Sequence, residues 1–237
     1  MACLWRRAAG SDVRRSELIE PMCLVRVSDF LRMTGPPPSY EELLAEGKLT
    51  EWDGSDESFT IFVAHEWMEK RHPDPEGVQS HCLRMALVNI LSAAVKVEFD
   101  VLAQSMCFNR VLSSEEVEKI REGYLWMDWM CLPQQSLTHT GLDLTHSMPR
   151  FVGRSDLLCI LAPNLHNSRN RLCSYATLQR RGWCRAEMWF KQMVLKPEDL
   201  PMLLIAGAFT QPSVCMLASY FSLSFNGKGL LKAVSVR

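Results

Sequence analysis

Short apolar runs of strand length alternate along this chain with longer segments that have the apolar periodicity of helices. The runs span 59–64, 124–129, 155–163 and 201–209. Between the first two, residues 78–98 place apolar side chains at i, i+3 and i+4 spacing, while Gln79, Arg84, Asn89 and Lys96 fall elsewhere around the helix. Strands that alternate with helices in this way build a parallel sheet with helices on both faces, so the pattern predicts an α/β fold.

Three further segments have the features of helices. In the N-terminal lead-in, residues 1–50, Ser39 and Glu42 have capping-box spacing, which predicts a short helix over 40–46. Residues 113–123 begin with serines and acids and end at a glycine, which predicts an inserted helix. Residues 181–195 form the third. Residues 51–237 are therefore expected to form the α/β domain.

Composition narrows the class of protein. With 237 residues, 47% of them hydrophobic, the chain can bury one substantial core. Lys and Arg number 26 and Asp and Glu 27, so the formal charge of -1 supplies no large field to attract nucleic acid or an anionic membrane. No run approaches the ~18 apolar residues of a membrane span. The nine cysteines include no CxxC pair, which is typical of reduced, buried thiols.

These properties predict a soluble cytoplasmic protein. The alternative is a mitochondrial leader, because four arginines lie near the N-terminus, but three acidic residues dilute that pattern. The arginines are Arg6, Arg7, Arg14 and Arg15, and the acids are Asp12, Glu17 and Glu20.

Residues 37–40, from Pro37 to Tyr40, read PPSY and match the PPxY pattern that WW domains bind. The same residues fit the entry of the capped helix at 40–46. We favour the helix entry, because four-residue motifs recur often by chance, and keep a WW-domain contact as the weaker alternative.

Polar residues follow the apolar runs, at the carboxyl ends of the predicted parallel strands. The carboxyl ends of parallel strands lie at the same edge, and open α/β sheets bind ligands there. We therefore expect the residues that end the first three runs to lie near one another. They are His65, Glu66 and Trp67, then Asp128, Trp129 and Cys131, then Pro163 and Asn164.

Glu187 is the strongest candidate for a catalytic residue. It lies about one turn into the helix that begins near Arg181, where the helix dipole favours a carboxylate and the side chain can face the cleft. A carboxylate there would stabilise the positive charge that develops when an N-glycosidic bond breaks. The alternative is an ordinary glutamate that stabilises its own helix.

Other chemistry-bearing residues leave alternatives open. Asp128 either orients a loop or contacts a ligand. His65 and Glu66 can form an acid–base pair, although a hydrogen-bonded loop anchor is the more common use of such residues. Cys184 lies near a helix N-terminus beside Arg185, which lowers a thiol pKa, but its tryptophan neighbour favours a structural role.

Standard ligand fingerprints are missing from the sequence. The histidines at 65, 72 and 81 have no zinc-site spacing, so no metal site is expected. The chain also lacks GxGxxG, GxxxxGK[ST] and GxSxG. A nucleotide would have to bind in another way.

Taken together, these segments resemble a known family, the TIR (Toll/interleukin-1 receptor) domain. The resemblance covers about residues 57–210, in the family's order. The chain is similar in particular to divergent protist and bacterial TIR-like proteins that carry SHxW, HPDPxG, WxDxxCLPQ and RGWCxxE segments. The second-strand signature is shared with fungal heterokaryon-incompatibility domains. The segments here are 59–67, 72–77, 126–134 and 181–187.

The resemblance implies a flavodoxin-like fold, self-association and, as in many members, cleavage of NAD as a substrate rather than a cofactor. The family's essential glutamate falls on Glu187. The resemblance also implies a nucleotide site formed by His65, Glu66, Trp67, Asp128, Trp129, Trp183 and Cys184. A non-catalytic interaction module is the alternative. This sequence departs from the family in Ala64 for the serine of SHxW, in the long insertion at 100–123 and in a C-terminus where the last elements look shortened.

Overall fold

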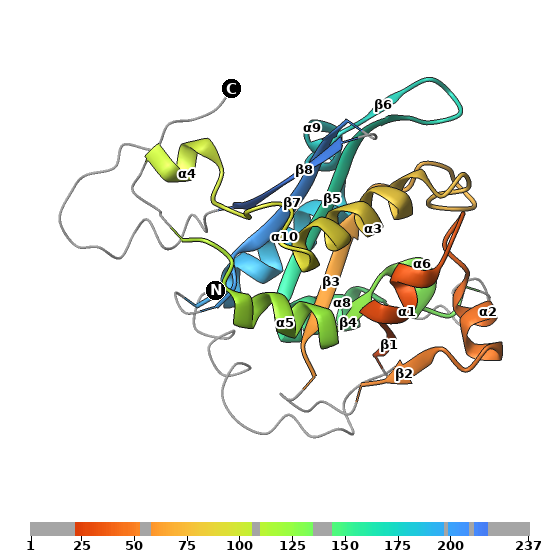
Figure 1. Ribbon diagram of the computed structural model, residues 1–237. Coiled ribbons are helices and arrows are strands. Elements are labelled where there is room, and N and C mark those ends of the chain that lie inside the picture. The colour runs from red at the N-terminus through yellow and green to blue at the C-terminus, as the bar shows by residue number, and fades with distance from the viewer. Residues whose placement is uncertain are drawn as a thin grey trace.

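The computed structural model of the protein describes residues 22–52, 58–105, 110–134, 144–196, 199–208 and 211–217. Its centre is a mostly parallel sheet with helices on both sides (Figure 1). Four parallel strands form the middle of the sheet. They are β3 (Thr60–His65), β4 (Tyr124–Trp126), β5 (Leu157–His166) and β7 (Met202–Ala208), and they confirm the predicted α/β class.

The order of the parallel strands creates a crevice at one edge of the sheet. They lie side by side as β4-β3-β5-β7. The chain therefore leaves β3 toward one side of the sheet to form β4, then crosses back to form β5 on the other side. Where neighbouring strands connect in opposite directions, their carboxyl ends open a crevice. Here that point lies between β3 and β5.

The sheet edges are antiparallel, unlike the wholly parallel sheet that the sequence predicts. At one edge β1 (Cys23–Arg26) pairs with β4, and β2 (Leu49–Glu51) pairs with β1. At the other edge β8 (Gln211–Leu217) pairs with β7, and the short β6 (Leu172–Cys173) pairs with the end of β5. The N-terminal lead-in thus contributes two strands to the main sheet.

Helices cover both faces of the sheet (Figure 1). Helices α1 (Val27–Arg32), α3 (Val78–Leu91) and α5 (Ser114–Glu122) lie on one face, and α8 (Leu144–Arg154) and α10 (Gly182–Val194) on the other. The other described helices are α2 (Tyr40–Ala45), α4 (Val101–Ser105), α6 (Asp128–Cys131) and α9 (Tyr175–Leu178). None of the helices in the described ranges has the length and apolar character needed to cross a membrane.

Local signals fixed several helix ends. Ser39 and Glu42 form the predicted capping box at α2. At α5 the sequence predicts only a serine cap, and the structure shows a complete capping box of Ser113 and Glu116. Helix α3 ends at Leu91 rather than at 98, because Ala93 adopts a left-handed backbone with φ of 54° that turns the chain.

The core lies on both faces of the parallel strands. All six residues of β3 are buried, as expected for a central strand with helices above and below. Phe62 of β3 stacks on Trp126 of β4 with ring centroids 4.3 Å apart, and Phe151 of α8 packs against the same indole at 5.8 Å. This aromatic group fixes β3 and β4 so that their carboxyl ends meet in register.

Candidate functional site

The residues that end β3 and β4 come together at the carboxyl edge of the sheet, as the sequence predicts. His65 is the last residue of β3, and Asp128 begins α6 just after β4. The predicted strand at 124–129 was too long, because β4 ends at Trp126. The reason is that the Asp128 carboxylate accepts the N–H of Trp129 at 2.7 Å and starts a helical turn instead.

The His65 imidazole lies between two side chains. Its Nε2 is 2.9 Å from Oδ1 of Asp128, and its Nδ1 is 3.1 Å from Oε1 of Gln79. The other Asp128 oxygen accepts the indole N–H of Trp67 at 2.7 Å. The site therefore joins the ends of two strands to the first turn of α3.

These contacts decide the charges on His65 and Asp128. Burial disfavours the charged form of each group, but the attraction between them and their hydrogen bonds outweigh it. The pKa of His65 lies above its ordinary value, and the pKa of Asp128 lies below its own. Both shifts favour the form of the pair in which His65 is protonated and Asp128 is ionised.

Glu187 lies on the buried face of α10, next to this pair. Its residue is 8% exposed, and its Oε2 has no hydrogen-bond partner among the described residues. Burial and the neighbouring Asp128 charge raise the pKa of Glu187 to about 8, although His65 opposes the rise. The prediction placed Glu187 facing a cleft; in the structure it is enclosed instead, and at neutral pH it is mainly protonated.

Cys184, one turn earlier on α10, has the structural role that we expected. It is buried, and its thiol donates to the backbone oxygen of His65 at 3.3 Å. Burial raises its pKa to about 12, so it is no nucleophile at neutral pH. Its neighbour Trp183 is 52% exposed and was predicted as a binding residue, but it lies on the outer side of α10.

Glu66 does not pair with His65, so the acid–base pair left open by the sequence is not formed. Its carboxylate accepts the hydroxyl of Thr177 at 2.7 Å and lies 3.3 Å from Nε of Arg181. Arg181 also donates to the backbone oxygen of Trp67 at 3.4 Å. Glu66 is therefore the anchor that ties the end of β3 to α9 and to the start of α10.

The HPDPEG segment, residues 72–77, holds α3 against the site. Asp74 is buried, and its two oxygens accept the N–H groups of Gln79 and Ser80 at 3.1 and 2.7 Å, which caps the helix. Gly77 has φ of 70°, and a Cβ there would lie 2.3 Å from the backbone of Gly35. Only glycine fits this position.

Aromatic rings lie beside this loop. Trp67 and Trp129 meet edge to face at 5.9 Å, and His72 packs on Trp129 at 4.5 Å. The Trp129 indole donates to the oxygen of Pro37, which is buried, while Tyr40 begins α2. The PPSY residues thus serve the helix entry, and a WW domain would have to displace Pro37 from Trp129.

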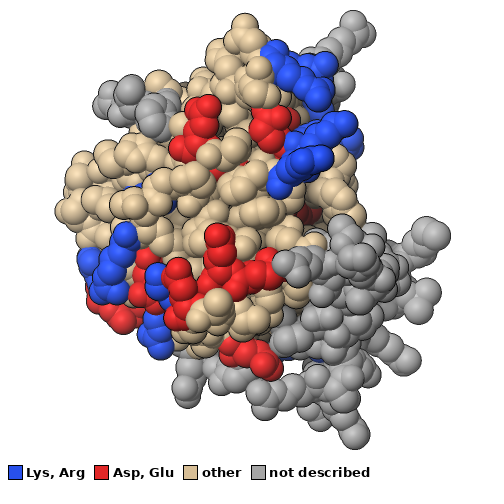
Figure 2. Space-filling model, turned by 90° about the vertical axis from the view of Figure 1, so that its right-hand side faces the viewer, with Lys and Arg blue, Asp and Glu red and all other residues tan. Residues whose placement is uncertain are grey.

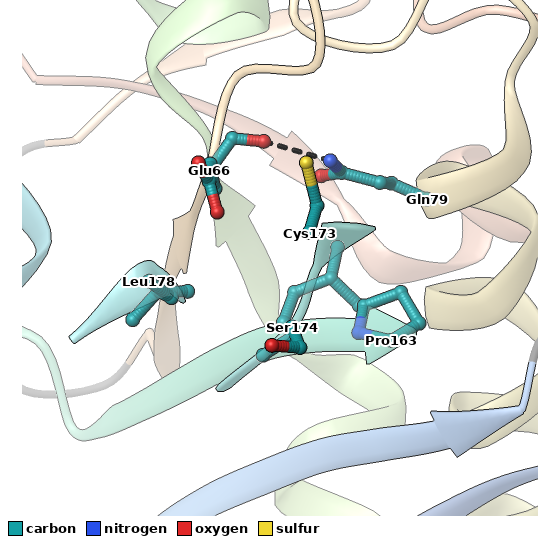
Figure 3. Close-up of a pocket in the computed structure, with 8 residues that line it drawn as sticks. Glu66, Gln79, Pro163, Cys173, Ser174 and Leu178 are labelled. Atoms are coloured by element: carbon teal, nitrogen blue, oxygen red, sulfur yellow. Dashed lines mark hydrogen bonds between the residues drawn. The ribbon is translucent and has the colours of Figure 1, made fainter. Parts of the chain in front are cut away.

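A small cavity opens at the crevice between β3 and β5 (Figure 3). Glu66, Gln79, Pro163, Cys173, Ser174 and Leu178 are among its lining residues. The Gln79 side-chain amide reaches across to the backbone oxygen of Glu66 at 2.7 Å. The cavity measures about 10 Å³, which is room for roughly one water molecule. A larger ligand can enter only if this edge opens.

Sequence reasoning missed three residues that organise the site, namely Gln79, Thr177 and Arg181. Gln79 was assigned to the polar side of its helix, yet it is only 3% exposed. The one feature of the sequence that could have indicated burial of Gln79 is its position just after the HPDPEG segment, whose Asp74 caps α3. No group of three His, Cys, Asp or Glu side chains within the described ranges is arranged to hold a metal ion.

The face in Figure 2 carries both acidic and basic side chains, which lie next to one another at the lower left, and no single sign of charge covers it. Comparisons of the chain with protein-family models, curated proteins and solved structures find no match.

Proposed function

We propose that the protein is a TIR-like enzyme that hydrolyses NAD at the nicotinamide–ribose bond, with Glu187 as the catalytic carboxylate. The observation that carries this proposal is the enclosed Glu187 carboxyl, which has an unpartnered oxygen and lies next to the ends of β3 and β4. A buried carboxyl without a partner costs stability, and residues with such a cost are concentrated at functional sites.

The strand order supports the same proposal. Numbered along the chain, the four parallel strands lie in the order 2-1-3-4, which matches the flavodoxin-like arrangement. Sheets of this kind bind nucleotides at the crevice beside the first and third parallel strands. In this chain those strands are β3 and β5, and Glu66 and Pro163 line that crevice.

In the proposed reaction the bond between C1′ of the ribose and the nicotinamide nitrogen breaks, and its electron pair leaves with nicotinamide. Positive charge develops on the ribose, and the Glu187 carboxylate stabilises it. Water then adds to C1′ and releases a proton, which gives ADP-ribose. His65 and Asp128 shape the pocket, and Trp67 or Trp129 stacks on a planar ring of the substrate.

The first experiment is nicotinamide release from NAD by the concentrated wild-type protein and by Glu187→Gln. Removing a group that stabilises transition-state charge typically lowers kcat by roughly 100-fold or more, and we expect a loss of that size. Glu118→Gln, on the exposed face of α5, is the matched control and should keep full activity. Equal nicotinamide release by the wild type and by Glu187→Gln would show that another carboxylate reacts.

The pH profile supplies a second test. Only the ionised form of Glu187 stabilises a cation, and its pKa is about 8. Below that pH, kcat/KM should therefore rise about tenfold for each pH unit, and it should level off above it. A profile that stays flat from about pH 6 to 9 would mean that the reacting carboxylate has an ordinary pKa.

A non-catalytic self-association module is the second candidate. The observation that favours it is a set of large apolar side chains exposed on α10, namely Trp183, Trp189 and Met193, which are 52%, 56% and 53% exposed. Sedimentation over a concentration series measures this association. A folded wild type that associates but releases no nicotinamide would favour the module over the enzyme.

A further inference from the structure

The proton on Nδ1 of His65 is fixed by the way its neighbour Gln79 is held. The Gln79 amide nitrogen lies 2.7 Å from the backbone oxygen of Glu66, and a carbonyl oxygen can only accept a hydrogen bond. The Gln79 amide oxygen must therefore face His65. Since that oxygen is also only an acceptor, Nδ1 of His65 must carry a proton to form the 3.1 Å contact.

The second ring nitrogen faces a carboxylate. Oδ1 of Asp128 lies 2.9 Å from Nε2, and the Asp128 oxygens also accept the Trp67 indole and the Trp129 backbone N–H. Two other N–H donors stabilise Asp128 as the ionised acceptor. The proton in the His65–Asp128 hydrogen bond therefore belongs to Nε2, and the ring carries two protons.

Gln79 itself is held rigidly. Its backbone N–H donates to Asp74, its side-chain amide donates to Glu66, and the residue is 3% exposed. Rotation of the amide by 180° would turn its N–H₂ group toward Nδ1 and its oxygen toward the backbone oxygen of Glu66. Two oxygens that can only accept would then face each other, so the hydrogen bond to Glu66 would be lost. The acceptor that His65 meets is thus built into the first turn of α3.

We propose that Gln79 is a positioning residue that holds His65 as a permanent imidazolium cation beside Asp128 and Glu187. Without the Gln79 acceptor, a neutral ring could satisfy Asp128 through Nε2–H alone. The Gln79 acceptor is thus the reason why Nδ1 of His65 also carries a proton. The charged groups that act on the ring are Asp128 of α6 and Glu187 of α10.

The consequence for catalysis rests on the proposed function. A His65 cation offsets the Asp128 charge and so favours the ionised form of Glu187, the form that would react. The protonation state of His65 itself does not depend on NAD cleavage, so it can be measured separately.

The test is a pH titration of the His65 ring nitrogens by ¹⁵N–¹H NMR. In the wild type we expect both nitrogens to carry protons at pH values more than one unit above the ordinary pKa of about 6.5. Gln79→Met, which keeps the length but removes the acceptor, should lower the pKa by at least one unit, about tenfold in proton affinity. Gln79→Glu keeps an acceptor and should retain the doubly protonated ring.

The controls separate the possible failures. Gln104→Met removes a side-chain contact with the backbone of Phe99, away from the site, and should leave the His65 titration unchanged. A singly protonated wild-type ring at neutral pH overturns the proposal even if Gln79→Met does not fold, and so does an unchanged pKa in a folded Gln79→Met. A doubly protonated ring in a protein that releases no nicotinamide would uphold this inference and reject the proposed function.

Discussion

Replacing Glu187 with glutamine should stabilise the fold, and by an amount that grows as the pH rises from 5 to 8. The pKa of Glu187 is raised from an ordinary 4.5 to about 8 in the folded protein. Above pH 4.5 the unfolded chain loses this proton while the folded chain keeps it, so wild-type stability falls until the pH reaches the folded pKa. Glutamine has no proton to lose. The difference in unfolding free energy between the two proteins should therefore grow by roughly 3 kcal/mol over this interval.

Urea denaturation at pH 5, 6, 7 and 8 measures this difference. Glu115→Gln is the control, because the Glu115 side chain is 79% exposed and its replacement should change stability by about 0.5 kcal/mol or less at every pH. A Glu187→Gln protein whose advantage is the same at all four pH values would contradict the raised pKa. Higher stability together with lost NAD cleavage would identify Glu187 as a residue kept for function at the expense of the fold.

Truncating Trp126 to alanine should destabilise the protein by about 4 kcal/mol. The side chain is 1% exposed and lies between Phe62 and Phe151, so its removal leaves a cavity that three different elements border. The free energy of unfolding in urea measures the loss. Trp189→Ala is the matched control, since Trp189 is 56% exposed and the same truncation should cost less than about 1 kcal/mol there. Similar losses at the two positions would mean that the aromatic group does not organise the core.

The sequence predicted those parts of the fold that local chemistry determines. The run 59–64 was recognised as a strand because every side chain in it is apolar or β-branched, and β3 is indeed buried throughout. The capping box at Ser39 and the serine cap at Ser113 were predictable because their hydrogen bonds join residues three apart. The meeting of His65 and Asp128 followed from the rule that parallel strands end at one edge.

Features that depend on tertiary packing were not predictable in this way. Gln79 was placed on the polar side of its helix because periodicity treats a glutamine as a surface residue. It is buried because its amide oxygen accepts from His65 and its amide N–H donates to Glu66, residues that only the folded chain brings near. Glu187 was predicted about one turn into its helix, and its enclosure depends on how α10 packs against β3.

The pairing of distant strands also governs the order in which a newly made chain can fold. Val25 of β1 pairs with Leu125 of β4, and Ile61 of β3 pairs with Leu157 of β5, so each pair joins residues about one hundred positions apart. Ribosomal synthesis runs from the N-terminus, and β3 therefore leaves the ribosome long before either of its neighbours exists. Its apolar residues must wait for β5 before the sheet closes. A product that stops before β5 contains β1 to β4, but the side of β3 that pairs with β5 stays open to wrong partners.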